Sequence, residues 1–136
     1  LGWVGQIVEV NPTPLQVLLN AGMTPVVSPS SLGRDGHSYN VNADQAALAI
    51  ARGLGAARLV FVSNVPGVLV DGQCVRALTT EQAEAWIGEG NISGRMIPKV
   101  RAALEAAARG VAQAVITDLA GLAGDGGTVF VGAHND

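Results

Sequence analysis

Lysine is nearly absent from this chain of 136 residues: Lys99 is the only one, and the other seven basic residues are arginines. A bias toward Ala, Gly, Val and Arg explains why lysines are scarce, but it does not explain why one is kept at position 99. An ammonium is a compact point charge on a flexible stem, so it suits a phosphate that moves during a reaction better than a planar guanidinium does. Taken alone, Lys99 is equally consistent with a surface lysine in the first turn of a helix.

Other features are scarce or missing as well. Cys74 is the single cysteine, so an intrachain disulfide is impossible and a reducing compartment is expected. Only five residues are aromatic, the net charge is -3 and no basic run occurs, which argues against nucleic acid as the main partner. No apolar run reaches the roughly 20 residues that span a bilayer, and Leu1-Gly2-Trp3 lacks the basic start of a signal peptide. We therefore expect a cytoplasmic protein that binds neither nucleic acid nor membrane.

Several motifs that carry chemistry are absent too. The chain has no Walker pattern, no GxGxxG, no HExxH and no GxSxG nucleophile elbow. His37 and His134 are too few and too distant in sequence to suggest a metal site, so no metal-ligating residue is predicted.

Strand-like and helical patterns alternate along the chain. Strands are predicted at residues 6–10, 24–28, 58–63, 114–117 and 128–131, and a hairpin is predicted around Asp71-Gly72. Helices are predicted over residues 13–21, from the cap Asn42 to residue 54, from Thr79 or Thr80 to residue 87, and over residues 97–109, with residues 30–39 as a loop. This order predicts an α/β fold, a mostly parallel open sheet with helices on both faces plus a β-hairpin. In such folds ligands bind beyond the carboxyl ends of the strands.

The first of three polar segments contains Asn40, Asn42 and Asp44. Asn42 is a good N-cap, with Gln45 completing a capping-box-like pair, and Asp44 in the first helical turn suits the helix dipole. A capped helix explains part of this pattern. Two amides and a carboxylate within five residues are more than a cap needs, however, which favours a functional site.

The second segment, residues 63–68, follows a predicted buried strand, where α/β proteins hold nucleotides or substrates; read alone, it is also an ordinary Pro-Gly turn. In the third, Gly90, Ser93 and Gly94 form an open approach to a helix N-terminus, whose amides are donors for phosphate oxygens. The charge of Lys99 opposes the helix dipole unless an anion binds at that end. Arg95 is either a further phosphate contact or a solvated side chain.

With these segments in order, the chain resembles the amino acid kinase family, and within it most closely the kinases that phosphorylate N-acetyl-L-glutamate. The matching features are Asn40-Val41-Asn42-Ala43-Asp44, Ser63-Asn64-Val65-Pro66-Gly67, Ser93-Gly94-Arg95-Met96-Ile97-Pro98-Lys99-Val100 and Gly127-Thr128, with Gly2-Trp3-Val4-Gly5 and Pro25-Val26-Val27-Ser28-Pro29 in addition. The resemblance covers essentially the whole chain. It implies that residues 1–136 are the carboxyl-terminal, ATP-binding half of such a kinase, with the amino-terminal half absent, because family members are about twice as long.

The resemblance implies phosphoryl transfer from ATP, with Mg²⁺, to the γ-carboxylate of N-acetyl-L-glutamate, which gives an acyl phosphate in arginine biosynthesis. Lys99 and Asp44 would be catalytic, with Asp44 orienting Lys99, and Asn40 and Asn42 would bind the substrate. The residues expected to bind the nucleotide are Ser63, Asn64, Val65, Pro66, Gly67, Val68, Leu69, Asn91, Ile92, Ser93, Gly94 and Met96. The full-length protein would be a homo-oligomer, and the isolated chain would be inactive because the other half brings a second lysine and most of the acceptor site.

Two positions depart from the family pattern. Asn64 stands where the family usually has Asp, and Gly94-Arg95-Met96 stands where it often has Gly-Gly-Met. Both variants are similar to the related kinase that phosphorylates carrier-protein-linked aminoadipate in lysine biosynthesis. That kinase, and a non-catalytic nucleotide-binding module, are the alternatives.

Overall fold

The computed structural model describes residues 3–131, so Leu1, Gly2 and His134 lie outside the described residues. The chain divides into two compact units, residues 1–54 and residues 55–136, and each is described by itself. Between residues 3 and 131, no helix combines the length and the apolar character that crossing a membrane requires.

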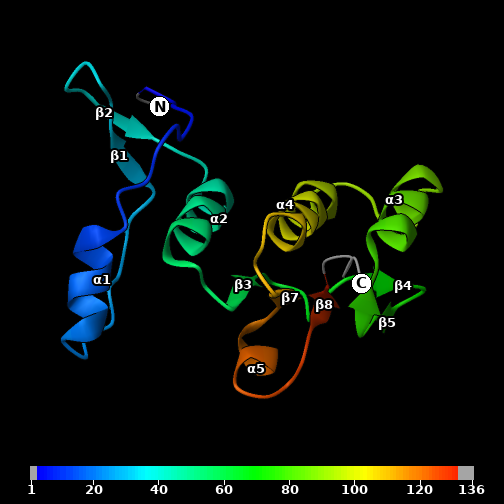
Figure 1. The fold of residues 1–136 in the computed structure, drawn as a ribbon. Coiled ribbons are helices and arrows are strands. Elements are labelled where there is room, and N and C mark those ends of the chain that lie inside the picture. The colour runs from blue at the N-terminus through cyan, green and yellow to red at the C-terminus, as the bar shows by residue number, and fades with distance from the viewer. Residues whose placement is uncertain (1–2, 132–136) are drawn as a thin grey trace. The chain divides into compact units, whose positions relative to one another are not determined.

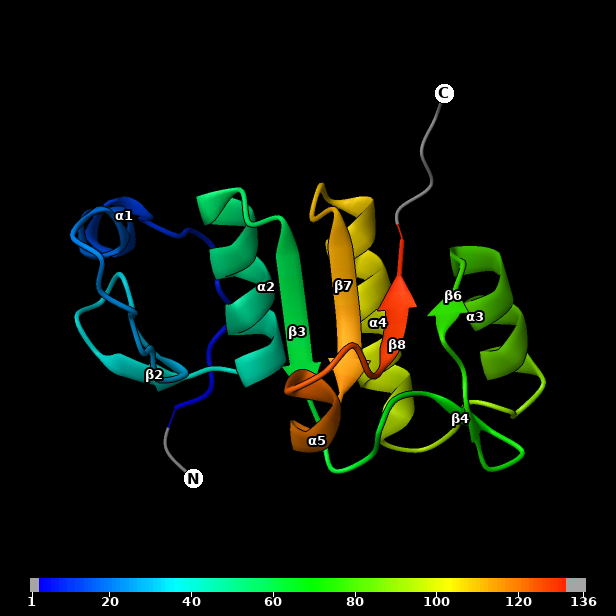
Figure 2. The ribbon, with the colours of Figure 1, turned by 90° about the horizontal axis from the view of Figure 1, so that it is seen from below.

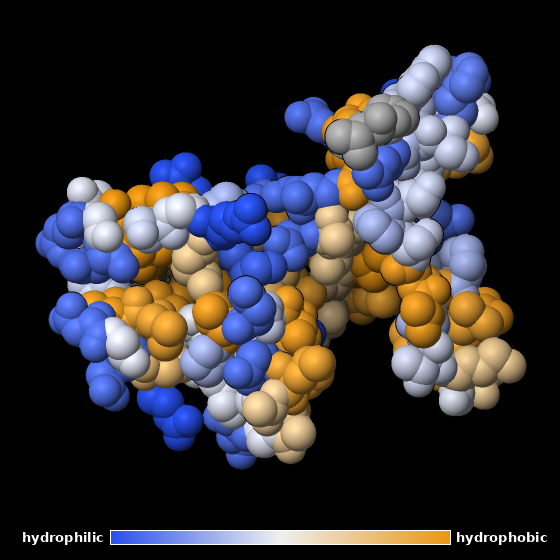
Figure 3. All heavy atoms as spheres, turned by 180° about the vertical axis from the view of Figure 1, so that it is seen from behind, coloured by the Kyte–Doolittle hydropathy of each residue, from blue (hydrophilic) through white to orange (hydrophobic). Residues whose placement is uncertain are grey.

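The first unit contains two helices and a small hairpin (Figure 1). Asn42 caps the second helix as predicted, because its Oδ1 accepts a hydrogen bond from the backbone N–H of Gln45 at 3.1 Å. The first helix has no buried residue, and apolar side chains lie on the surface over it (Figure 3). The elements are α1 (Thr13–Asn20), β1 (Ser30–Leu32), β2 (Ser38–Asn40) and α2 (Ala43–Leu54).

Three predictions for this unit are wrong. Residues 6–10 and 24–28 are irregular rather than strands, because a strand needs a ladder partner and none pairs with them among residues 3–131. Residues 30–39 are not simply a loop: β1 and β2 pair antiparallel, with Ser31 opposite Tyr39. Strands of three residues are too short to show an alternating pattern in the sequence.

The second unit follows the predicted α/β order closely. Its four-stranded sheet has the order β3-β7-β8-β6, in which β3 runs parallel to β7, β6 runs parallel to β8, and β8 runs antiparallel to β7. The sheet is therefore mixed but mostly parallel, and β4 and β5 form the predicted hairpin. The elements are β3 (Arg58–Val62), β4 (Leu69–Val70), β5 (Gln73–Cys74), β6 (Ala77–Leu78), α3 (Thr80–Gly88), α4 (Met96–Ala108), β7 (Gln113–Thr117), α5 (Leu119–Leu122) and β8 (Thr128–Phe130).

The core of this unit lies between α4 and the sheet. Val100, Ala103, Ile116 and Phe130 are fully buried, and the small alanines of α4 let the helix lie close to the strands. Figure 1 shows α4 on one side of the sheet and the short α5 on the other, which agrees with the prediction of helices on both faces. The antiparallel pairing of β8 was not predicted, because a three-residue strand carries no directional signal in its sequence.

Candidate functional site

The candidate site of the second unit lies at one edge of its sheet. Figure 2 shows that the carboxyl ends of β3 and β7 and the beginning of α4 all lie at this edge. The loop of residues 63–68 starts here, and the backbone N–H of Ser63 donates a hydrogen bond to the carbonyl oxygen of Thr117 at 2.7 Å. The topology thus brings the second and third polar segments together beyond the carboxyl ends of the strands, where ligands bind in such folds.

Lys99 is the fourth residue of α4 and is half-buried. Its Nζ lies 5.7 Å from the centroid of the ring of Phe61, a buried residue of β3 two positions before Ser63. The negative face of an aromatic ring attracts an ammonium at this distance. The contact directs the lysine charge over β3, close to the edge where the loop of residues 63–68 begins, and this is a favourable position for a group that meets an anion there.

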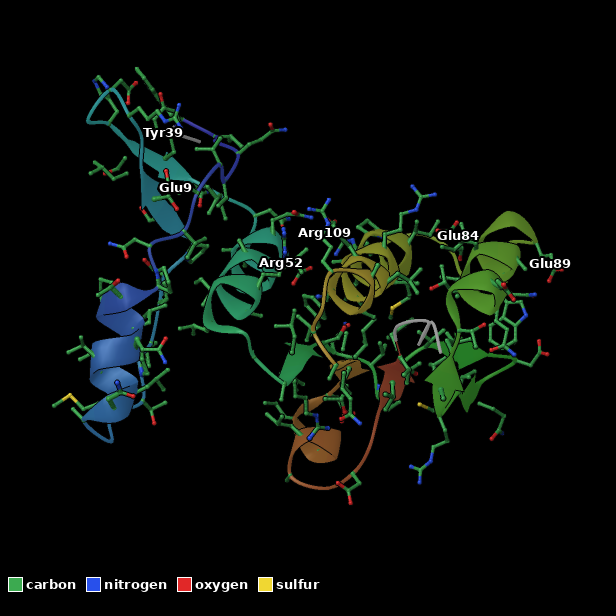
Figure 4. The ribbon with its side chains drawn as sticks, in the orientation of Figure 1. Glu9, Tyr39, Arg52, Glu84, Glu89 and Arg109 are labelled. Atoms are coloured by element: carbon green, nitrogen blue, oxygen red, sulfur yellow. The ribbon has the colours of Figure 1, made fainter. Side chains whose placement is uncertain are left out.

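The loop before α4 combines a buried anchor with exposed polar residues. The side chain of Ile92 is buried, and its backbone N–H donates to the carbonyl oxygen of Trp86 at 3.0 Å. Ser93 and Gly94 are exposed, and Gly94 has a φ of +59°, a conformation that glycine adopts without strain. Asn91 is also exposed, and its side-chain amide donates to Oε2 of Glu89, which is labelled at the end of α3 in Figure 4.

The loop of residues 63–69 is exposed at Asn64 and Leu69, but it is buried at Gly67 and Val68. Gly67 has a φ of +155°, and a Cβ added there would lie only 2.7 Å from Oγ1 of Thr128. The backbone N–H of Val68 donates to the same oxygen at 2.8 Å. The sequence alone gave Thr128 no role, although the Gly127-Thr128 pair at the start of the last strand was a visible signal.

In the first unit, Asn40, Asn42 and Asp44 lie together where β2 ends and α2 begins. Both asparagines are exposed, and Asp44 is half-buried. The backbone of Asn40 is held by hydrogen bonds with the main chains of Trp3 and Gly5, at 2.8 Å and 3.0 Å, which do not use its side-chain amide. Asp44 belongs to the first unit, and Lys99 belongs to the second.

A cavity of about 400 Å³ lies in the first unit, between residues 5–9 and residues 31–41. Tyr39, labelled in Figure 4, lines it, and its hydroxyl donates to Oδ2 of Asp35 at 2.7 Å. This hydrogen bond lowers the pKa of Asp35 and raises the pKa of Tyr39. The ring of Trp3 stacks on His37 with centroids 4.6 Å apart. Neither Asn40 nor Asn42 lines this cavity, which the sequence analysis did not identify.

Within residues 3–131, no group of three or more His, Cys, Asp or Glu residues could hold a metal ion. Mg²⁺ in phosphoryl-transfer sites keeps several waters and binds largely through the substrate phosphates. The donors of the site in the second unit, which are an ammonium, loop amides and a helix N-terminus, suit the phosphates rather than the metal.

The sequence profile of the amino acid kinase family matches residues 2–118. The chain therefore belongs to the amino acid kinase family, and the resemblance seen in the sequence is confirmed. Over 132 residues it is 55% identical to an acetylglutamate kinase of Chloroflexus aggregans, a match that covers 96% of this chain and 52% of that protein. An acetylglutamate kinase of Sinorhizobium fredii is 50% identical over 117 residues, which cover 85% of this chain and 40% of that protein. The chain thus spans about half the length of these relatives.

Solved structures share the fold. A crystal structure of a Streptococcus mutans protein superposes with a TM-score of 0.84 at 30% identity, covering 96% of this chain and 51% of that one. An N-acetylglutamate synthase of Neisseria gonorrhoeae gives a TM-score of 0.85 at 22% identity, over 96% of this chain and 32% of that one. At that identity the second likeness supports the fold alone.

Proposed function

We propose that this chain is the carboxyl-terminal, ATP-binding half of a cytoplasmic kinase that phosphorylates the γ-carboxylate of N-acetyl-L-glutamate in arginine biosynthesis. The observation that carries the proposal is the position of Lys99, at the start of α4 with its Nζ 5.7 Å from the Phe61 ring, beside the loop that follows β3. Relatives named acetylglutamate kinase, at 50–56% identity, support this choice of acceptor.

In the proposed reaction an oxygen of the acceptor carboxylate attacks the γ-phosphorus of MgATP. The bond between that phosphorus and the β,γ-bridging oxygen breaks, and ADP leaves with the negative charge. No covalent intermediate on the protein is needed, so catalysis consists of positioning and charge neutralisation. The ammonium of Lys99 would neutralise charge on the transferred group, and the backbone amides of Asn91, Ser93 and Gly94 in the open loop would hold the nucleotide phosphates.

Four of the other nucleotide-binding positions differ in the exposure of their side chains. Asn64 and Leu69 are exposed and would contact the nucleotide, whereas Val68 and Ile92 are buried and would act by anchoring the backbone of their loops. In the first unit, the exposed amides of Asn40 and Asn42 would bind the acceptor and Asp44 would be a catalytic residue.

The half-length match and the surface of the first unit support the assignment as part of a larger kinase. Val26 is 96% exposed and α1 buries none of its side chains, although both are strongly apolar. Apolar surface of this extent is characteristic of an interaction site. We propose that the part of the relatives that this chain does not match covers this surface, that this part completes the acceptor site, and that the full-length protein is a homo-oligomer.

A second acceptor is favoured by one observation. Asn64 and the Gly94-Arg95-Met96 sequence are the features that the chain shares with the kinase that acts on carrier-protein-linked aminoadipate. Both acceptors present a carboxylate to the same phosphoryl donor, so they imply one reaction type at the nucleotide site.

Trapping the acyl phosphate as a hydroxamate tests the proposal. The full-length gene product is incubated with MgATP, hydroxylamine and either N-acetyl-L-glutamate or carrier-linked aminoadipate. We expect hydroxamate with N-acetyl-L-glutamate and none from the isolated 136-residue chain. Product only with the carrier-linked acceptor would establish the second candidate, and product with neither would leave a non-catalytic nucleotide-binding module.

A further inference from the structure

The hydroxyl group of Thr128 connects three segments of the second unit. Thr128 is fully buried, and its Oγ1 accepts a hydrogen bond from the backbone N–H of Val68 at 2.8 Å. The same Oγ1 donates to the carbonyl oxygen of Val75 at 2.6 Å. The backbone N–H of Val75 in turn donates to the carbonyl oxygen of Val68 at 2.9 Å.

These contacts meet at the base of the β4–β5 hairpin. Val68 directly precedes β4 and Val75 directly follows β5, so a single hydroxyl from the first residue of β8 holds both sides of the hairpin. Gly67 packs against the same point, because a Cβ on it would lie 2.7 Å from Thr128 Oγ1 and 2.8 Å from Cys74 Sγ. The sheet, the hairpin and the loop of residues 63–69 are therefore joined at one oxygen atom.

We propose that Thr128 is a positioning residue for the nucleotide site: its hydroxyl holds the loop of residues 63–69 in the conformation that binds ATP. This inference rests on the proposed function of that loop. Without the hydroxyl, the buried N–H of Val68 would lose its partner, and the half-buried carbonyl oxygen of Val75 would keep only a weak contact with the Cys74 thiol at 3.9 Å. The loop could satisfy the N–H of Val68 only by moving toward water. Thr128 acts through the backbone of Val68 and is not proposed to touch the nucleotide.

The chain supplies a matched control at Thr117. This threonine is also buried, at the end of β7, and its Oγ1 has no hydrogen-bond partner among the described residues. Thr117→Val and Thr128→Val remove the same hydroxyl from the same sheet with the same change of shape, but only the second removes hydrogen bonds. Thr128→Ser keeps the hydroxyl and loses only a methyl group.

The test combines calorimetric titration of the 136-residue chain with MgATP and hydrogen exchange of its backbone amides. We expect Thr128→Val to raise the dissociation constant about tenfold, the effect of losing the hydrogen bond that holds the backbone N–H of Val68. It should also speed exchange at the amide of Val68. Thr128→Ser and Thr117→Val should match the wild type in both measurements.

Wild-type affinity and exchange in Thr128→Val would overturn the proposal. If Thr128→Val does not fold, Thr128→Ser decides: fast exchange at Val68 despite a retained hydroxyl would also overturn it. Failure of the proposed function is seen separately, as absence of MgATP binding to the wild-type chain. In that case exchange at Val68 still shows whether Thr128 holds the loop.

Discussion

Replacing Lys99 by methionine should weaken MgATP binding and leave stability nearly unchanged. Methionine keeps an unbranched side chain and removes the ammonium group, with its positive charge and its three N–H donors. The substitution therefore separates a lysine that binds phosphate from a lysine that serves the fold.

The structure sets the size of both effects. A positive charge in the fourth position of α4 opposes the helix dipole, so removing it stabilises the fold by about 0.3–1 kcal/mol. Losing the contact of Lys99 Nζ with the Phe61 ring costs about 0.5–1 kcal/mol. These two terms nearly cancel, so together they change the free energy of unfolding by less than about 1 kcal/mol. One charge-assisted hydrogen bond to a phosphate contributes about 1.5–3 kcal/mol, which corresponds to a rise of about 10- to 150-fold in the dissociation constant.

Titration calorimetry with MgATP measures the first effect and urea unfolding the second. Lys99→Arg serves as the matched variant, because it keeps the charge and changes its geometry, and it should bind more tightly than Lys99→Met. Equal affinity of Lys99→Met and the wild-type chain would refute the phosphate-binding role of Lys99. A large loss of stability in Lys99→Met would show instead that the lysine serves the fold.

Three further predictions concern the fold and its titration. Ile116→Ala should lower the free energy of unfolding, measured in urea, by about 2–5 kcal/mol, because Ile116 is fully buried on β7. Val62→Ala should lower it much less, because the side chain of Val62 is 44% exposed. Equal losses would contradict the assignment of Ile116 to the core. Tyr39→Phe should raise the pKa of Asp35 toward 3.8, followed by NMR of the carboxyl carbon. Folding lowers the pKa of Asp35, so the hydrogen bond stabilises the fold above pH 3.8, and this stabilisation is lost as the pH falls through the pKa of the folded state. An unchanged pKa in Tyr39→Phe would exclude Tyr39 as the cause of the lowered pKa of Asp35. Thr79→Ala should lower the free energy of unfolding in urea by about 1 kcal/mol, because Thr79 Oγ1 caps α3, whereas Thr80→Ala should change it little. A larger loss in Thr80→Ala than in Thr79→Ala would be inconsistent with the cap.

Much of the second unit could be predicted from local sequence alone. The buried strand that became β3, the hairpin around Asp71-Gly72 and the helix that holds Lys99 all follow from patterns a few residues long. The same patterns left the cap of α3 open between Thr79 and Thr80, and the structure assigns it to Thr79. Because ligands in such folds bind beyond the carboxyl ends of the strands, the loop after β3 was expected to belong to the site. Figure 2 shows that the start of α4 lies at the same end of the sheet.

The first unit shows where such reasoning fails. Residues 6–10 and 24–28 have strand-like sequences and yet form no strand, because pairing depends on a neighbouring segment rather than on the segment itself. The hairpin of β1 and β2 was missed for the opposite reason: its three-residue strands carry little pattern and are defined by the register that places Ser31 opposite Tyr39.

By itself, the sequence predicted the α/β order of the second unit, the family, and the candidate residues of the site, because helix periodicity, caps, turns and motifs are local along the chain. Only the tertiary structure placed Lys99 over the ring of Phe61 and the hydroxyl of Thr128 between Val68 and Val75. Those contacts join residues 38 to 60 positions apart in the sequence, and the packing of α4 and β8 with the rest of the unit decides them. A local pattern carries no information about which distant group will face it, so these partners could not be read from the sequence.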